Sequence, residues 1–285
     1  AELAVAAVQG GGPRGIRAVD ADERLVLDRH VEASADVPAG TDLVLWPEDV
    51  VGTAGPFAGS AAEAAVQEVA RRLGATLVVG VVEGAGDRFR NAAVVLDGEG
   101  RPVDRFDKVH RVPFGEYIPF RSLLERVADV SAVPRDAEAG RGPGVLDTPA
   151  GRMAVTISYE VFFAHRARSG VEAGGRLLLV PTNASSYTTE QVPAQEAGRW
   201  VVQAAPTGYS VVVDQRGRVV AQGPLGDRAV VTEIVELRAG RTLAMRLGDR
   251  PGVAAAAMVI AFGWWRSRKL SELDSGMLPS LRRLR

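Results

Sequence analysis

The stretch from Ala154 to Phe163 constrains the fold of this chain more than any other. An apolar, strand-like run ends abruptly at Ser158, and Tyr159, Glu160 and a second apolar run follow. A side chain that can act as a nucleophile, placed where a strand gives way to a helix, is typical of a nucleophile elbow. The segment therefore predicts a protein with a sheet, helices beside it, and a reactive side chain exposed at a strand end.

Two earlier segments have the same character. Residues 42–48 form an apolar run that ends in Trp46, Pro47 and Glu48, and residues 105–108 end in Lys108. The second run continues through residues 109–119, which read V-H-R-V-P-F-G-E-Y-I-P and contain Glu116. Taken alone, a carboxylate or a lysine after a strand is most often a solvated surface group. The three segments together point to chemistry.

In this order, the segments W-P-E, K-x-H-x-V-P-F-G-E-Y-x-P and S-Y-E resemble the signatures of the nitrilase (carbon-nitrogen hydrolase) superfamily. Within it, they are most similar to the catalytic domain of the bacterial apolipoprotein N-acyltransferases. The resemblance runs from about residue 4 to about residue 269. It implies an α/β fold, a four-layer α-β-β-α sandwich with catalytic residues at strand ends, followed by a C-terminal apolar membrane helix.

The resemblance also implies roles for individual residues. Glu48 is the expected general base, and Lys108 is the expected electrophilic partner that polarises the acyl carbonyl. Glu116, in a rigid turn, is expected to support both as an acid or base. The backbone N–H of Tyr159 is a candidate oxyanion donor, and Glu160 is expected to help position the site.

Ser158 departs from the family, which has cysteine at this position. A thiol ionises near pH 8.5, whereas a hydroxyl is far less acidic and needs a stronger base. Ser158 could be an introduced substitution that disables an intact site, a natural divergence that leaves a binding protein, or a true serine nucleophile. The first is our working interpretation. A Ser-His-Asp hydrolase is a weaker rival, because no G-x-S-x-G motif is present.

Composition narrows the other function classes. The net charge of −1 does not indicate a nucleic-acid-binding protein, which usually carries an excess of lysine and arginine. The chain contains no cysteine, and its three histidines, His30, His110 and His165, have no metal-ligand spacing. We therefore expect no cofactor, no metal and no nucleic-acid partner.

The C-terminal region differs from the rest. Residues 252–265 carry no charge, end in Trp264 and Trp265, and are followed by Arg266, Arg268 and Lys269. At about 1.5 Å per residue the run spans about 20 Å, less than a hydrocarbon core of about 30 Å. The tryptophans and the basic flank nevertheless favour a membrane boundary. We predict a catalytic domain at residues 1–240, an apolar helix at 251–269 and a polar tail at 270–285.

The resemblance implies an acyl chain moved from a phospholipid donor to the N-terminal amine of a diacylglyceryl-lipoprotein acceptor, through a covalent acyl-enzyme. It places the protein at the cell membrane, with an extracytoplasmic catalytic domain. The alternatives are a soluble carbon-nitrogen hydrolase acting on a small amide, and a non-catalytic lipid-binding homologue. The family also has membrane helices ahead of its catalytic domain, which these 285 residues do not include.

Local patterns predict the regular elements. Apolar runs and turn residues indicate strands near residues 3–9, 43–46, 76–82, 151–157, 176–180 and 229–235. Helical periodicity covers residues 20–34 and 60–73, the latter with Ser60 as N-cap and Gly74 as its end. Turns at 97–100 and 214–217 predict two hairpins. Strands alternating with helices in one part and paired by hairpins in another favour a layered α/β fold with a mixed sheet.

Overall fold

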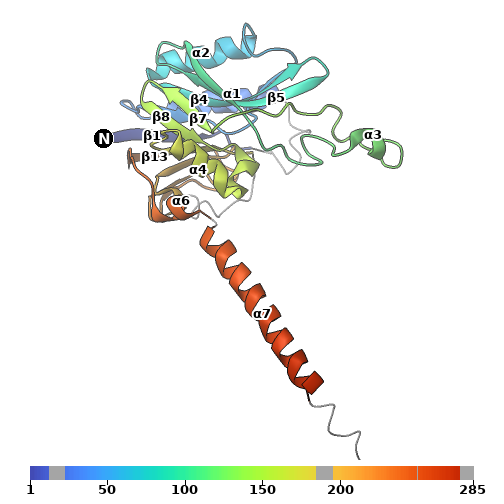
Figure 1. Ribbon diagram of the computed structural model, residues 1–285. Coiled ribbons are helices and arrows are strands. Elements are labelled where there is room, and N and C mark those ends of the chain that lie inside the picture. The colour runs from blue at the N-terminus through green and yellow to red at the C-terminus, as the bar shows by residue number, and fades with distance from the viewer. Residues whose placement is uncertain (13–22, 184–194, 249, 277–285) are drawn as a thin grey trace, which may run out of the picture. The chain divides into compact units, whose positions relative to one another are not determined.

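The computed structural model describes residues 1–12, 23–183, 195–248 and 250–276 (Figure 1). Two compact units are present, residues 1–242 and residues 243–285, and each is described by itself. The first unit contains every residue for which we predicted a catalytic role.

The first sheet of this unit mixes parallel and antiparallel pairs. Its order across the described residues is β13 (Ala229–Glu236), β1 (Glu2–Gln9), β2 (Leu43–Leu45), β4 (Thr76–Ala85), β5 (Arg88–Leu96) and β6 (Pro102–Asp107), with β3 (Val51–Thr53) also paired to β4. The strands β2 and β3 both run parallel to β4, one after the other along the same edge. The chain between them leaves the sheet, which matters for the site.

The second sheet is built the same way. Its order is β12 (Val219–Gln222), β11 (Val211–Val213), β10 (Val201–Ala204), β9 (Leu178–Pro181), β8 (Gly151–Val155) and β7 (Val145–Thr148). The central strands β8, β9 and β10 are parallel, while the outer pairs are antiparallel. The hairpins predicted from the turns at 97–100 and 214–217 are both present, as β5–β6 and β11–β12.

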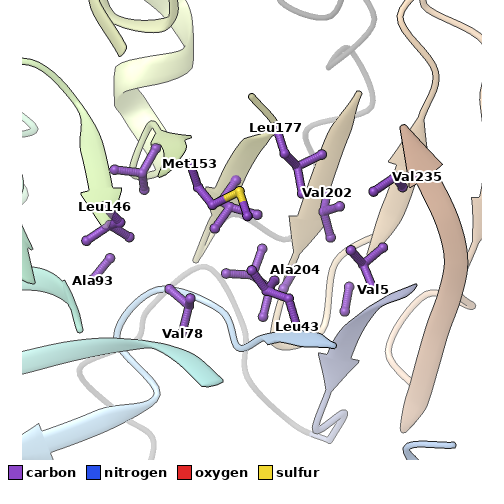
Figure 2. Close-up of a cluster of buried hydrophobic side chains, with 14 of the residues drawn as sticks. Val5, Leu43, Val78, Ala93, Leu146, Met153, Leu177, Val202, Ala204 and Val235 are labelled. Carbon is purple, nitrogen blue, oxygen red and sulfur yellow. The ribbon is translucent and has the colours of Figure 1, made fainter. Parts of the chain in front are cut away.

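The two sheets pack face to face over one apolar core (Figure 2). Val5, Leu43 and Val78 come from the first sheet, and Met153 and Val202 from the second, all fully or almost fully buried. Because side chains alternate across a strand, every second residue of these runs faces this core.

The intervening residues of the first sheet face helices instead. Val44, Leu77 and Val79 belong to a second buried cluster, with Val66 and Val69 of helix α2 (Ala61–Leu73). Figure 1 shows α2 and α1 (Glu23–Ala33) over this outer face, and α4 (Ala164–Glu172) beside β8 of the other sheet. Helices therefore flank a pair of sheets, which confirms the predicted layered α/β fold with mixed sheets.

Helix α2 begins and ends as its sequence predicts. The hydroxyl of Ser60 accepts a hydrogen bond from the N–H of Glu63 at 3.0 Å, as an N-cap does. Gly74 ends the helix in the left-handed conformation, with φ of 60°. Residues 20–22 of the other predicted helix lie outside the described residues, and α1 covers 23–33 of it.

Some elements were not predicted. The strands β3, β7 and β10 have three or four residues each, too few to show a period. Two short helical segments, η2 (Ser34–Asp36) and α3 (Arg121–Leu124), were also not predicted. The helix expected directly behind Ser158 is a 3-10 turn, η3 (Ser158–Phe162), and α4 starts only at Ala164.

The second unit consists of α6 (Leu243–Leu247) and α7 (Arg250–Gly276). Helix α7 contains the predicted apolar run and continues past Lys269 into the segment expected to be a polar tail. Its side chains from Val253 to Trp265 are exposed. Among the described residues, no helix combines the length and the apolar character that a membrane crossing requires.

Candidate active site

Glu48 lies in the loop that leaves the first sheet between β2 and β3. The N–H of Gly80 on β4 donates to the carbonyl of Pro47 at 3.1 Å, which holds this loop against the strand. A Cβ at Gly80 would lie 2.2 Å from the Pro47 oxygen and 2.5 Å from the Glu48 Cα. Only glycine at position 80 lets the backbone of Glu48 approach so closely.

Lys108 follows the last residue of β6, and Glu116 lies in the turn beyond it. The N–H of Lys108 donates to the carbonyl of Asn91 on β5 at 2.8 Å. In the turn, the N–H of Val112 donates to one oxygen of Glu116 at 2.8 Å. The β5–β6 hairpin and this turn therefore aim both side chains at the same point.

The three predicted side chains meet in one buried cluster. The Nζ of Lys108 donates to Oε1 of Glu48 at 2.7 Å and to Oε1 of Glu116 at 2.8 Å. The Nδ2 of Asn91 donates to the same two oxygens, at 2.8 Å and 2.9 Å. Lys108 is 2% exposed and Glu48 3% exposed, so solvent screens these charges little.

The cluster keeps its central charges. Burial alone would raise the pKa of Glu48, but the charge of Lys108 and hydrogen bonds from Lys108, Asn91 and Ser158 hold that pKa below its ordinary value. Burial likewise opposes the charged form of Lys108, yet the carboxylates of Glu48 and Glu116 raise its pKa. At neutral pH the pair is a carboxylate and an ammonium, suited to accept a proton and to polarise a carbonyl.

Ser158 stands at the end of β8 in a conformation that a side chain disfavours. Its φ is 48°, in the left-handed region, which is uncommon for residues other than glycine. Its hydroxyl accepts a long hydrogen bond, 3.4 Å, from Oγ1 of Thr182, and Ser158 is close enough to Glu48 to help lower the pKa of that carboxyl group. Strain of this kind clusters at functional sites, and the sharp turn agrees with the predicted nucleophile elbow.

Glu160 is fully buried and bonds to backbone rather than to the reacting groups. One oxygen accepts the N–H groups of Val109 at 2.9 Å and His110 at 3.1 Å, directly after Lys108. The other accepts the N–H of Ile157 at 3.0 Å, directly before Ser158. Glu160 therefore ties the lysine segment to the elbow. Tyr159 lies between Ser158 and Glu160, and its ring packs edge-on to Phe162 and Phe163.

The structure thus brings Glu48, Lys108 and Glu116 into one hydrogen-bonded group, with Ser158 close to Glu48 and with Tyr159 and Glu160 next to Ser158 in the chain. Sequence reasoning missed four contributors: Gly80, Asn91, Thr182 and Asn183. The N–H of Asn183 donates to the second oxygen of Glu48 at 3.0 Å. A signal existed for Asn91, a lone polar residue at the head of an apolar run, and for Asn183, a polar residue at a strand end. Nothing in the sequence marks Gly80.

Candidate metal ligands are not gathered anywhere in the described part of the chain. No group of three or more histidine, aspartate or glutamate side chains is arranged to hold an ion there. The carboxylates of the cluster are instead compensated by Lys108 and by amide donors.

Comparison with known proteins places the chain among relatives. Residues 4–244 match the carbon-nitrogen hydrolase family. Apolipoprotein N-acyltransferase from Geobacter metallireducens is 31% identical over 288 residues, covering 93% of this chain and 54% of the relative. That from Gloeobacter violaceus is 32% identical, covering 87% and 50%. The chain therefore spans about half the length of these curated relatives.

Solved structures share the fold at lower identity. Nit3 of Saccharomyces cerevisiae, a member of branch 10 of the nitrilase superfamily, has a TM-score of 0.62 at 19% identity, covering 88% of this chain and 94% of that one. A cysteine-to-serine mutant of an amidase from Nesterenkonia AN1 has a TM-score of 0.61 at 22% identity, covering 90% and 97%. These similarities support the fold alone.

Proposed function

The chain belongs to the carbon-nitrogen hydrolase family, and from that premise we propose that its first unit is the acyl-transfer domain of an apolipoprotein N-acyltransferase. The observation that carries this proposal is the Glu48–Lys108–Glu116 cluster, with the strained turn at Ser158 beside it. That arrangement places a base, a cation and a nucleophile position next to one another. The names of the curated relatives favour acyl transfer between lipids and lipoproteins.

In the first half-reaction, the side chain at position 158 attacks the ester carbonyl of a phospholipid and passes its proton to Glu48. Lys108 and the N–H of Tyr159 stabilise the oxyanion that forms. The ester C–O bond breaks, the lysophospholipid takes the proton from Glu48, and the acyl group stays on residue 158. Glu116 keeps Lys108 charged and in place through both steps.

In the second half-reaction, the α-amino group of a diacylglyceryl-lipoprotein attacks the acyl-enzyme. Its proton passes to Glu48 and then back to the side chain at position 158, which leaves as the acyl carbon forms its amide bond. The enzyme returns to its starting state after two transfers, a ping-pong scheme.

Ser158 weakens this chemistry. A carboxylate whose pKa is held low is a weak base, and it accepts a proton far more readily from a thiol than from an alcohol. The site therefore suits cysteine, and we propose that serine at position 158 leaves it assembled but impaired.

The second unit supports a membrane location. Its helix α7 exposes Trp264 and Trp265, and the guanidinium of Arg268 lies 4.1 Å from the Trp264 ring centre. The ammonium of Lys269 lies 4.9 Å from the ring centre of Trp265. Tryptophan beside a cation is typical of a membrane–water interface. We propose that α7 contacts the cell membrane through this end of the helix, and that the protein works at the outer side of that membrane.

A second candidate is a soluble amidase acting on a small amide. The similarity to the fold of the Nesterenkonia amidase favours it. An amidase would use the same cluster, so the acyl donor separates the two proposals.

The test is acylation of Ser158→Cys in the 285-residue chain. Intact-mass spectrometry after incubation with phospholipid in mixed micelles should show one acyl group added, and none with Glu48→Gln in the same background. A small amide such as butyramide, offered separately, should give no lasting adduct. Release of ammonia from the amide without an adduct from phospholipid would favour the amidase, and neither an adduct nor ammonia release in a folded variant would falsify both.

A further inference from the structure

Asn91 makes contacts that neither the sequence motifs nor the proposed reaction explain. It lies on β5, opposite Val82 of β4, and its side chain is 95% buried, with 5% relative exposure. Its backbone carbonyl accepts a hydrogen bond from the N–H of Lys108. Its side-chain nitrogen, Nδ2, donates to Glu48 and to Glu116. A single neutral residue therefore contacts all three charged members of the cluster.

The amide can adopt only one orientation. With the opposite one, the amide oxygen would lie 2.8 Å and 2.9 Å from two carboxylate oxygens, an arrangement of three acceptors with no donor. In the observed orientation, the oxygen Oδ1 is buried and has no hydrogen-bond partner among the described residues. An unsatisfied buried acceptor costs about 1–3 kcal/mol, so the two donated bonds serve a purpose that outweighs this cost.

The charges around the cluster define that purpose. Glu48 and Glu116 both point an oxygen at Lys108, so two negative groups share one positive group. Asp49 adjoins Glu48 in the chain and accepts a bond from the Asn183 side chain at 3.2 Å. Glu160 lies on the elbow, 3.5 Å from Arg166. Lys108 alone leaves an excess carboxylate, and like-charged carboxylates in one site favour protonation of one of them.

We propose that Asn91 is a positioning residue that holds the carboxylates of Glu48 and Glu116 turned towards Lys108, so that Glu48 is free to accept the proton of the nucleophile. Each carboxylate accepts one N–H bond from the amide, which adds no charge of its own. The side chain acts through the two acids and does not touch the reacting atoms.

This inference rests on the proposed function in one respect, that Glu48 accepts the proton of the nucleophile during acyl transfer. Its test needs neither lipid nor lipoprotein. The chain has no cysteine, so Ser158→Cys introduces a single thiol at the elbow. Its alkylation by iodoacetamide can be followed across pH by mass spectrometry. In a plot of alkylation rate against pH, we call the low-pH part, where the rate rises with pH, the acid limb. Because the thiol passes its proton to Glu48, the position of the acid limb follows the coupled ionisation of these two groups.

In the Ser158→Cys background, Asn91→Leu should move this acid limb to higher pH by about one unit or more, because Glu48 loses a donor that favours its anion. Asn91→Asp keeps the shape but adds a third carboxylate, and should move the limb further in the same direction. Asn91→Asp also decides the question if the leucine variant does not fold.

Gln203→Leu is the matched control. Gln203 is a buried amide on β10 of the other sheet, whose nitrogen donates to the Tyr209 carbonyl at 2.9 Å. Its loss should lower the melting temperature and leave the acid limb in place. A limb that stays unmoved in Asn91→Asp, or moves equally in Gln203→Leu, would overturn the role of Asn91. Failed phospholipid acylation with a shifted limb would contradict only the proposed function.

Discussion

The two halves of the candidate site are held in place by different means. Glu48, Asn91 and Lys108 lie in or next to the first sheet, and the ends of their side chains are bonded to one another. Ser158 and Glu160 follow β8 of the second sheet and are fixed by backbone, through a left-handed turn and through amides bound to Glu160. The acid–lysine half is therefore sensitive to charge, and the elbow half to backbone geometry.

The largest effect is expected from Lys108→Met, because it leaves the buried carboxylate of Glu48 and the partly buried one of Glu116 without their cation. Breaking a buried ion pair on one side costs about 3–5 kcal/mol, and acylation in the Ser158→Cys background should be lost. Urea unfolding measures the first and mass spectrometry the second. Lys269→Met, at the other lysine of the chain, is exposed and should change stability by less than about 0.5 kcal/mol. Equal stability of the two variants would contradict the claim that the acid–lysine half of the site depends on the charge of Lys108.

Glu160→Gln tests whether the elbow is tied to the lysine segment. An amide offers a single acceptor oxygen, so the backbone N–H of Ile157 or those of Val109 and His110 lose their partner. We expect a loss of about 1.5–3 kcal/mol in urea unfolding.

Glu68→Gln is the control for this change. Glu68 pairs with Arg71 on the exposed surface of α2, and surface pairs contribute about 0–1 kcal/mol. If the two glutamate variants unfold alike, Glu160 does not join the halves.

Gly80→Ala should displace Glu48 without touching a charge. The added Cβ would meet the Pro47 oxygen and the Glu48 Cα, and overpacking of this kind costs about 1–3 kcal/mol. Gly84→Ala on the same strand would meet the backbone of Ala54 instead, away from the cluster. Both variants should be less stable, but only Gly80→Ala should slow alkylation of Cys in the Ser158→Cys background. Slowing in both would mean that alkylation reports general distortion of β4.

The smallest effect concerns backbone strain at the elbow. Ser158→Gly and Ser158→Ala lose the same hydroxyl, but only alanine keeps a Cβ at φ of 48°. The glycine variant should be more stable than the alanine variant by about 1 kcal/mol. At the exposed helical position 64 in α2, the order should reverse, with glycine about 0.5–1 kcal/mol less stable than Ala64. If the glycine variant is the more stable one at both positions, or the less stable one at both, the backbone at Ser158 is not strained.

The predictions from sequence were most accurate where a signal is local. The cap at Ser60, the end at Gly74 and the two hairpins depend on residues a few positions apart. The strands β3, β7 and β10 were missed because each is short and includes a polar residue or glycine, so none stands out as an apolar run. A helix was expected behind Ser158, whereas the chain first makes a 3-10 turn and α4 begins only at Ala164.

The candidate site divides in the same way. The sequence by itself indicated which side chains form the candidate site, since Glu48, Lys108, Glu116 and Ser158 each end or follow a recognisable run. Only the tertiary structure decided that Asn91 bonds to Glu48 and Glu116, that Gly80 makes room for Glu48, and that Glu160 joins the two sheets through backbone amides. The residues in these contacts are 25 to 51 positions apart, and their distances depend on how strands pair and sheets pack. A linear pattern contains residue type and spacing, whereas a hydrogen bond also requires a position in space.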